Sequence, residues 1–421
     1  MIWTLVILPL GGLLLGLPVF LVLMLSVLAT LAFFLNMPAT MLHQTIFGSI
    51  SSYTLLAIPF FIFAGELMGR GGISRRIIDW VLALVGRMPG AVGLVTVGTS
   101  SIYGAISGSS PATVASVGRQ LYPEMEKAGY SKPFSLGLLN AGGAISIVIP
   151  PSINFILYGA VAEQSIASLF TAGILPGLLL SSLLAIAVVV YAMRNNIREG
   201  SKFSFPHLVV ATRRAFWSLL TPIIVLGSIY GGIVSPTEAG GIACVYALGV
   251  TTLIHRDLSL RDVLEIAGNS ALLTAQIMII VAAAGIFSWV LTVTGFQATL
   301  TGFVSTLDLQ PWMVLLAINV LLLVIGCFID PTSAVLTLTP LLLPVAMHLG
   351  VNPIHFGVIM TVNLSIGMYT PPFGLNLFVT QAVLKARTID IYKGVLPFVL
   401  LQIIALMAIT YIPWFSMAFL Q

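Results

Sequence analysis

Charged residues are scarce in this 421-residue sequence. Lysine and arginine together number 17 and the acidic residues 13, which is 7% of the chain, whereas a soluble domain carries about 25%. So few charges do not cover the surface of a soluble protein of this length. Hydrophobic residues make up 58% of the chain, enough for roughly ten to twelve spanning helices of about 20 residues each. The composition predicts an all-α polytopic membrane protein.

Several catalytic and structural signatures are also missing. Two cysteines, Cys244 and Cys327, exclude a disulfide framework and a cysteine metal cluster. The chain has no Gly-Lys dipeptide, so it has no Walker A loop, and it has neither HExxH nor a dinucleotide fingerprint. The net charge of +4 is not gathered on one basic face, so we expect no nucleic-acid partner. We predict that the chain is not an enzyme and that any energy comes from an ion gradient or a separate subunit.

The basic residues occur in clusters with long gaps between them. Residues 1–69, 133–193 and 263–384 contain no lysine or arginine. Because cytoplasmic loops retain these residues, we place every cluster on the cytoplasmic side of a bacterial inner membrane. The start of the chain lacks the basic region of a cleavable signal peptide, so we keep it as the first membrane segment.

Apolar segments between the clusters predict the membrane topology. Crossings are expected at 53–69, 133–162, 168–193, 215–234, 239–254, 266–293, 353–384 and 394–419, with an interfacial helix at 71–88. Two pairs of short arms, 90–106 with 111–126 and 311–328 with 334–349, each flank a polar or proline-containing turn. We interpret both pairs as re-entrant hairpins. Ordinary helix pairs remain the alternative.

An internal repeat supports the hairpin interpretation. A shift of 221 residues superposes six glycines and prolines, including Gly129 on Gly350 and Pro150-Pro151 on Pro371-Pro372, where about one match is expected by chance. Five predicted crossings separate the hairpins, and an odd number inverts the second copy. Inverted repeats with interrupted helices are typical of secondary transporters, although a pore can also be built from repeats. The repeat divides the chain into four parts: residues 1–88 with the N-terminal spans, 89–193 with the first hairpin and broken helix, 194–310 with the linker and scaffold spans, and 311–421 with the second hairpin and broken helix.

Small polar residues gather at the predicted hairpin tips and helix breaks. The tips are 104–113 and 326–333, and the breaks are 141–154 and 363–376. A Pro-Pro pair removes two amide donors and forces the preceding residue out of helical geometry, which leaves carbonyl groups without partners at a cost of several kcal/mol each in a bilayer. Carbonyl and hydroxyl oxygens together suit sodium. The N-termini of the next half-helices suit a carboxylate.

Three acidic residues are open to more than one interpretation. Asp330 lies at the second tip in a region nearly free of charge, where an acid is a candidate sodium ligand or charge balance, or the N-cap of a helix at Pro331. Glu66 is either functional or a structural hydrogen-bond partner. Glu238 indicates a helix start with the acid in its first turn.

With these motifs, the sequence resembles the large membrane subunit, DctM type, of tripartite ATP-independent periplasmic (TRAP) transporters over nearly its whole length. The matching stretches are 59–68, 104–116, 149–152, 173–177, 235–240 and 369–374. The resemblance implies a sodium-driven elevator in which hairpins and broken helices form a transport domain that slides against a scaffold. It also implies a separate small four-helix membrane subunit, a periplasmic substrate-binding protein, and an organic acid such as a C4-dicarboxylate or sialic acid.

The resemblance implies three sets of site residues. One sodium site would involve Ser107, Ser109, Ser110, Gly143 and Pro150, and the second Gly326, Asp330, Thr332, Gly367 and Thr370. Ser152, Asn154 and Asn376 would face the substrate. A stand-alone sodium/carboxylate symporter and the large subunit of a tripartite tricarboxylate transporter are the closest alternatives. An ion channel is a further alternative, which the two unlike polar tips disfavour.

Overall fold

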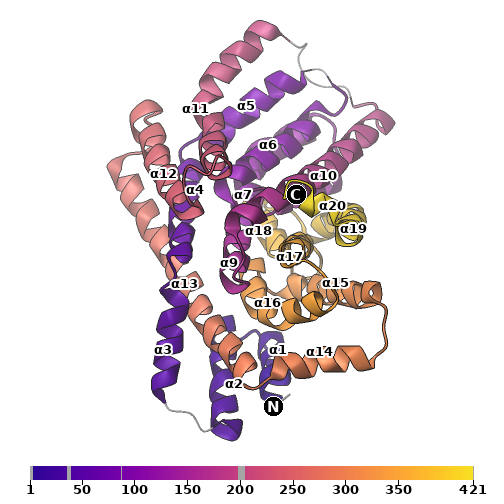
Figure 1. Ribbon diagram of the computed structural model, residues 1–421. Coiled ribbons are helices and arrows are strands. Elements are labelled where there is room, and N and C mark those ends of the chain that lie inside the picture. Colours follow the sequence, from indigo (N-terminus) through magenta and orange to yellow (C-terminus); the bar gives the residue numbers. More distant parts are fainter. Residues whose placement is uncertain (1–2, 36–38, 87, 198–203, 421) are drawn as a thin grey trace.

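The computed structural model describes residues 3–35, 39–86, 88–197 and 204–420, and across these ranges the chain forms helices and no strands (Figure 1). Among the described residues, eight helices are long and apolar enough to cross a membrane. This is fewer than the roughly ten to twelve spans estimated from composition. Shorter apolar helices account for part of the difference, among them the first arm of the first hairpin, Ala91–Ser107, and the half-helices Pro353–Gly367 and Leu375–Leu384. Both arms of the second hairpin, Pro311–Phe328 and Pro331–His348, are long and apolar enough to be counted among the eight. Arg87, Arg198 and Lys202 of the basic clusters lie outside the described residues.

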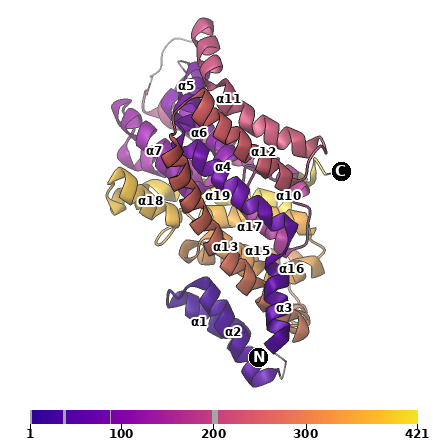
Figure 2. The ribbon, with the colours of Figure 1, turned by 90° about the vertical axis from the view of Figure 1, so that its left-hand side faces the viewer.

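The N-terminal part begins with a helical pair and ends in two helices joined at a sharp turn. Its elements are a π-helix at Trp3–Ile7, α1 (Leu8–Leu14), α2 (Val19–Phe34), α3 (Ala39–Ile50), a 3₁₀ turn at Tyr53–Leu56, α4 (Ala57–Arg70) and α5 (Ile73–Val85). Figure 2 shows α1 and α2 at one end of the molecule, beside the long α13 (Leu260–Val293). Helix α5 matches the interfacial helix expected at 71–88, with one apolar face buried and Arg75 and Asp79 exposed.

The first repeat contains a hairpin, a broken helix and a long helix. These are α6 (Ala91–Ser107), α7 (Ser110–Lys127), α8 (Lys132–Ile145), α9 (Ile153–Val161) and α10 (Ile166–Arg194). Two residues join the hairpin arms, and seven residues around Pro150-Pro151 separate α8 from α9. The expected hairpin arms at 90–106 and 111–126 therefore agree with the structure to within one residue.

The linker and the second repeat follow. They comprise α11 (Phe205–Tyr230), α12 (Pro236–Leu248) with a π-helix at Gly249–Ile254, α13, α14 (Phe296–Thr306), α15 (Pro311–Phe328), α16 (Pro331–His348), α17 (Pro353–Gly367), α18 (Leu375–Leu384), α19 (Thr388–Tyr411) and α20 (Trp414–Met417). Helix α11 begins ten residues before the expected segment 215–234. Helices α3 and α14 had no counterpart in the sequence prediction. Glu238 forms a capping box with Ser235, which confirms the predicted helix start.

The two repeats have matching local structure. Helices α6 to α10 correspond in order and spacing to α15 to α19. Gly129 and Gly350 both take positive φ, 92° and 79°, after the second hairpin arm, a conformation that glycine adopts without steric cost. Ser131 and Asn352 then cap α8 and α17 through their side chains. The 221-residue pattern is therefore a repeat of structure as well as of sequence.

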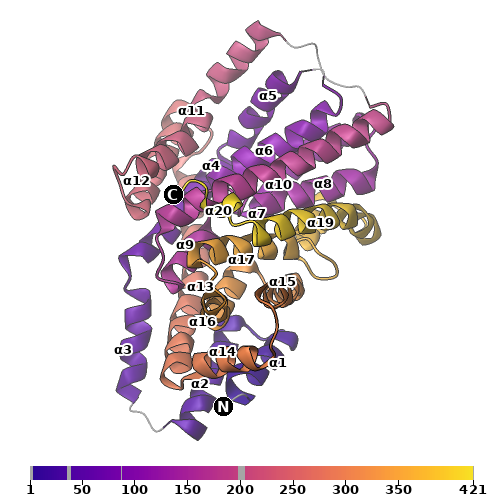
Figure 3. The same ribbon diagram turned by 45° about the vertical axis from the view of Figure 1, so that its right-hand side comes forward.

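Each repeat packs mainly on the other. Helix α8 crosses α19 and α17 crosses α10, while α18 lies on α7 and α9 lies on α16 (Figure 3). At the α8–α19 crossing, Gly137 meets Gly394, and an added Cβ at Gly137 would lie 2.8 Å from the Phe398 ring. Only the absence of side chains at both positions permits this approach. The two repeats therefore fold as one interlocked body.

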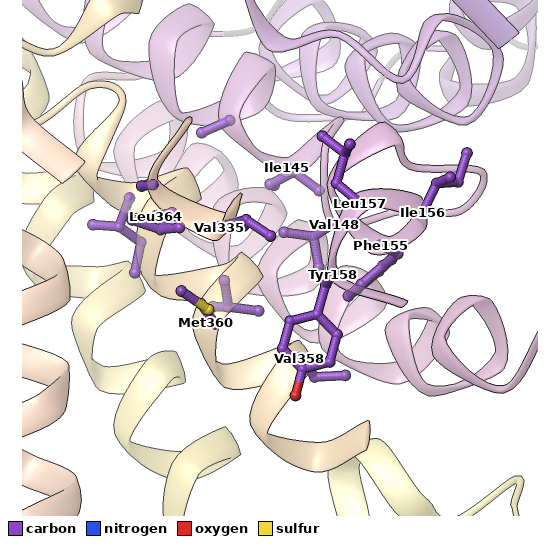
Figure 4. Close-up of a cluster of buried hydrophobic side chains, with 14 of the residues drawn as sticks. Ile145, Val148, Phe155, Ile156, Leu157, Tyr158, Val335, Val358, Met360 and Leu364 are labelled. Atoms are coloured by element: carbon purple, nitrogen blue, oxygen red, sulfur yellow. The ribbon is translucent and has the colours of Figure 1, made fainter. Parts of the chain in front are cut away.

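A core of buried side chains joins α9 to the second repeat (Figure 4). Phe155 and Tyr158 of α9 are fully buried, as are Val335 of α16 and Val358 of α17. The Tyr158 hydroxyl donates to the Pro353 carbonyl at 2.6 Å. This core holds the second half of the first broken helix against the hairpin of the other repeat.

Gly394→Ala tests the interlocking. An added Cβ would overlap the Pro133 carbonyl, and overpacking of this kind destabilises a protein by about 1–3 kcal/mol. We expect the unfolding temperature of the variant in detergent to be lower than that of the unmodified protein, as measured by tryptophan fluorescence. Gly268→Ala is the matched control, because its Cβ would meet nothing within 4 Å and alanine favours a helix by about 1 kcal/mol. Equal stability of the two variants would contradict the interlocked crossing.

Candidate functional site

The two hairpin tips meet at a cavity of about 480 Å³. The tips supply one wall, through Ser107 to Ala112 and Asp330 to Thr332, and α4 and α13 supply the other. The first residues of α7, α9, α16 and α18 all lie in its lining, as Ser110, Ile153, Pro331 and Leu375. Four helix N-termini therefore meet here, each with unpaired amides and partial positive charge.

The first tip is a tight turn with its hydroxyl groups close together. Gly108 takes a left-handed φ of 59° at the end of α6, and Ser109 is extended. The Ser107 hydroxyl lies 3.3 Å from that of Thr113, which donates to the Ser109 carbonyl at 2.8 Å. Ser107 and Ser110 are buried, whereas Ser109 is partly exposed. The tip therefore presents several oxygen atoms within one turn of chain.

The first break lies directly against this tip. An added Cβ at Gly104 would lie 2.5 Å from the Ser146 Cα, and one at Gly143 would lie 3.4 Å from the Ser110 carbonyl oxygen. The Gly143 carbonyl accepts hydrogen bonds from the Ser146 amide and hydroxyl. The structure thus places Ser110 next to Gly143, two of the residues that the resemblance assigned to the first sodium site. Pro150 is buried in the same break, outside the cavity lining.

The second tip is built on Asp330. Its carboxylate accepts a hydrogen bond from the Ser333 amide at 3.0 Å and caps α16. The N-cap interpretation is therefore confirmed. Asp330 also lines the cavity and is partly exposed, so the same carboxylate has oxygen lone pairs free for a cation.

The second break meets the first arm of its hairpin through glycines. An added Cβ at Gly367 would lie 2.6 Å from the Gly326 Cα. The Thr370 hydroxyl donates to the Ile366 carbonyl at 2.8 Å. In the part of the chain that the structure describes, no hydrogen bond joins Thr370 to Asp330. Of the five residues predicted for the second sodium site, Asp330 and Thr332 line the cavity, and Gly326, Gly367 and Thr370 lie behind it.

Two hydrogen bonds cross between the repeats at the tips. The side-chain amide of Asn376 donates to the Ser110 hydroxyl at 2.7 Å, and the Thr332 hydroxyl donates to the side-chain oxygen of Asn154 at 3.5 Å. A shift of 222 residues converts Ser110 into Thr332 and Asn154 into Asn376, so the two contacts are equivalents. We call them the tip contacts. In each, the half-helix after one break holds the tip of the other repeat.

The predicted substrate residues therefore lie in different environments. Asn154 lines the cavity, whereas Asn376 and Ser152 are fully buried outside its lining. The Ser152 hydroxyl donates to the Ile147 carbonyl. One amide atom of each asparagine, Asn154 Nδ2 and Asn376 Oδ1, is buried with no hydrogen-bond partner.

Sequence reasoning singled out Glu66 at the rim of the cavity but missed the two arginines there. Arg70 and Glu66 of α4 and Arg119 of α7 all line it. Arg70 pairs with Glu265 at 2.8 Å, and Arg119 is exposed with no ion pair to any described residue. Arg119 lies nine residues after Ser110, beyond the tip motif at 104–116. The only sequence signal for it was a basic side chain on a hairpin arm. Glu66 faces the cavity, partly buried, which favours the functional interpretation.

The donor set at the tips suits a hard cation. Within the described ranges there is no group of three or more histidine, cysteine or acidic side chains that would hold a metal ion. The atoms on offer are hydroxyl and carbonyl oxygens with one carboxylate. Oxygen ligands of this kind match hard cations rather than zinc or other soft metals.

A family model and known proteins match the chain. The model of the tripartite ATP-independent periplasmic transporter, DctM component, covers residues 6–415. The isethionate TRAP transporter permease protein DctMQ of Oleidesulfovibrio alaskensis is 40% identical over 408 residues, which are 96% of this chain and 64% of that protein. The C4-dicarboxylate TRAP transporter large permease protein DctM of Pseudomonas aeruginosa is 40% identical over 373 residues, 89% of this chain and 87% of that protein.

Two solved structures share the fold. The YdaH transporter of Alcanivorax borkumensis gives a TM-score of 0.64 at 15% identity and covers 90% of this chain and 88% of that one. MtrF of Neisseria gonorrhoeae gives 0.58 at 14% identity, with 91% and 83% covered. At these identities the likeness concerns the arrangement of helices.

A double-mutant cycle tests the Ser110–Asn376 contact. Because the bond is buried, we expect Ser110→Ala and Asn376→Ala to be coupled by about 1 kcal/mol in stability, measured by thermal unfolding in detergent. The control cycle pairs Ser109→Ala with Asn376→Ala, whose hydroxyl and amide are not hydrogen-bonded, and should show coupling near zero. Equal coupling in the two cycles would refute the contact.

Proposed function

The chain belongs to the DctM family of tripartite ATP-independent periplasmic transporters, and from this premise we propose that it imports an organic acid by sodium-coupled transport through an elevator movement. The observation that carries the proposal is the cavity between the two hairpin tips and α4 with α13. It combines four helix N-termini, a set of hydroxyl groups and one carboxylate. An anion and a cation can therefore bind side by side.

An organic anion fits the electrostatics of this cavity. Helix N-termini stabilise negative charge, and Arg70 and Arg119 add two guanidinium groups at the rim. Relatives are described as carrying isethionate, C4-dicarboxylate, ectoine and 2,3-diketo-L-gulonate. The range of these cargoes supports an acid-binding permease and does not select one acid. Asn154, which lines the cavity with an unpaired amide nitrogen, is the residue we propose to donate to the anion.

Sodium would be carried with the acid. We propose that Ser107, Ser109, Ser110 and Gly143 hold one ion and that Asp330 and Thr332 hold another, with Pro150, Gly326, Gly367 and Thr370 shaping the backbone behind them. Sodium binding would order the tips and complete the anion site. Empty and fully loaded carriers would then move, while half-loaded carriers would not, which prevents leakage of the sodium gradient.

The elevator proposal rests on the two walls of the cavity. Hairpins and broken helices of 89–193 and 311–421 interlock into one body, whereas α4 and α13 form the facing wall. The rim arginines belong to clusters that we predict to be cytoplasmic, so this cavity would open to the cytoplasm. Sliding of the interlocked body against α4 and α13 would carry the tips to the other side.

Two protein partners complete the proposed transporter. This chain spans 64% of the length of its DctMQ relative, which leaves room in that protein for further membrane segments. We propose that a small four-helix membrane subunit works together with this chain, and that a periplasmic binding protein delivers the acid at a bacterial inner membrane. Activity would require both.

Uptake by proteoliposomes tests the coupling and the partners together. Vesicles would contain this chain and its small membrane subunit, with or without an inward sodium gradient and the cognate binding protein. We expect accumulation of radiolabelled acid only when both are present. Sodium-driven uptake without a binding protein would instead indicate a stand-alone symporter. Fluxes far above carrier turnover would indicate a channel.

Two site variants test the cation assignment. Ser110→Ala and Asp330→Asn should abolish sodium-dependent uptake while the amount of inserted protein stays unchanged, because asparagine still serves as an N-cap. Ser182→Ala, an exposed serine on α10, is the control and should transport normally. Normal uptake by both site variants would refute the sodium sites.

The Arg119→Gln variant tests whether the arginine at the cavity rim attracts the anion. Loss of an exposed, unpaired guanidinium removes attraction for the anion without disturbing an ion pair, so we expect KM for the acid to rise about fivefold, which corresponds to about 1 kcal/mol. The sodium concentration for half-maximal uptake should not change. Arg194→Gln, at the far end of α10, is the matched control. A shift in sodium dependence would contradict the assignment of Arg119 to the anion.

A further inference from the structure

A second hollow, unrelated to the tips, lies between α5 and α11. It has a volume of about 650 Å³ and is lined by Arg76, Asp79, Val210, Arg213, Arg214, Trp217, Ile254 and His255. We call it the arginine groove. Its lining shares no residue with the cavity at the hairpin tips. Figure 3 shows α5 and α11 side by side on one side of the molecule.

The charge of the arginine groove is positive and partly uncompensated. Arg76 is held by Asp257 at 2.7 Å. Arg213 and Arg214 are exposed and form no ion pair with a described residue. Asp79 is the acid in the lining, and it lies beyond ion-pair distance of the arginines, since no such pair is formed in the described ranges. Two guanidinium groups therefore have donors available for an anionic ligand.

His255 adds a hydrogen-bonding atom to the same groove. Burial, with the nearby Arg76 guanidinium, lowers the pKa of His255 below its ordinary value, so the ring is neutral at pH 7 and the positive charge comes from the arginines. Its Nε2 atom is buried with no hydrogen-bond partner. A buried polar atom without a partner is destabilising and is satisfied when a ligand or water binds beside it.

An apolar groove continues from the arginines along α11. It is lined by Phe205, Leu208, Val209, Thr212, Arg213, Phe216 and Trp217, and so shares Arg213 and Trp217 with the arginine groove. Phe205 and Val209 are 68% and 51% exposed. The Trp80 indole donates to the Thr212 hydroxyl at 3.0 Å, which fixes α5 against α11 beside both hollows. Charge and apolar surface therefore adjoin in one continuous depression.

The position along α11 places this depression at a membrane surface. Helix α11 is a candidate span of 26 residues, and Arg213 and Arg214 interrupt its apolar sequence nine residues from the start. Arginines with flanking tryptophan are typical of the boundary between headgroups and acyl chains. The amphipathic α5 beside it is of the type that lies in that boundary.

We propose that the depression binds an anionic phospholipid, with the phosphate at Arg213, Arg214 and His255 and an acyl chain beside Phe216 and Trp217, on the membrane side of the arginines. Charge complementarity selects an anionic headgroup, and the adjoining apolar groove selects a lipid over a soluble phosphate. An acidic surface on a partner protein would satisfy the arginines but would not need the exposed aromatic rings of Phe216 and Trp217 beside them.

Native mass spectrometry of the full chain in detergent tests the proposal. Phosphatidylglycerol and phosphatidylcholine would be titrated separately, and the bound fraction of each measured. We expect phosphatidylglycerol to bind preferentially and its apparent affinity to fall about tenfold in the Arg213→Gln/Arg214→Gln variant, since each basic residue near a membrane surface contributes several-fold in affinity. Arg194→Gln, an exposed arginine in the last turn of α10, should leave binding within about twofold.

Three results would overturn the proposal of a phospholipid site. Equal binding of the two lipids, or undiminished phosphatidylglycerol binding by the double variant, would show that the arginines do not select the headgroup. Displacement of the lipid by an equal concentration of glycerol phosphate would assign the groove to a soluble phosphate. Loss of the small membrane subunit from the double variant, with lipid binding intact, would make the groove a protein interface.

Discussion

Breaks in two helices within a chain with few charges require polar partners, and hydroxyl side chains of the same repeat supply them to the backbone carbonyls. At each Pro-Pro pair the backbone loses amide donors, and burial makes the remaining polar groups costly to leave unpaired. The side chains that follow the breaks are paired across the repeats, Asn376 with Ser110 and Asn154 with Thr332. Because each partner belongs to the other repeat, neither broken helix is complete alone. The interlocked packing of α8 on α19 and α17 on α10 follows from the same exchange.

The two repeats are only approximately symmetric, and their hairpin tips differ in chemistry. Ser109 is the N-cap of α7 and Asp330 the N-cap of α16, so one N-cap is neutral and the other carries a charge. Behind the second tip, Asn363 donates to Asn319, which donates to Thr410, whereas the residues equivalent to Asn363 and Asn319 are Gly142 and Gly98. The second repeat thus has a polar interior where the first has close backbone contact.

Much of this architecture was predictable because it rests on local chemistry. Proline and glycine spacing predicted the arms of the first hairpin to within one residue, those of the second to within three, and both breaks, since these residues act on the backbone at their own positions. The helix start at Ser235 and the N-cap alternative for Asp330 followed from side-chain capping rules. Helices α3 and α14 were missed because the short segments 39–50 and 296–306 mix apolar and polar residues, and packing on α13 and α16 rather than hydropathy keeps them in place.

The sequence by itself determined the membrane class, the repeat and the chemical types gathered at the tips, because composition and spacing carry that information. Only the tertiary structure decided which of those residues share a cavity. It placed Asn154, Asp330 and the tip serines in the lining and Asn376 behind it, and it brought Arg119 to the rim. These outcomes depend on contacts between residues more than 170 positions apart, such as Thr332 with Asn154. Packing, rather than local backbone preference, creates such contacts.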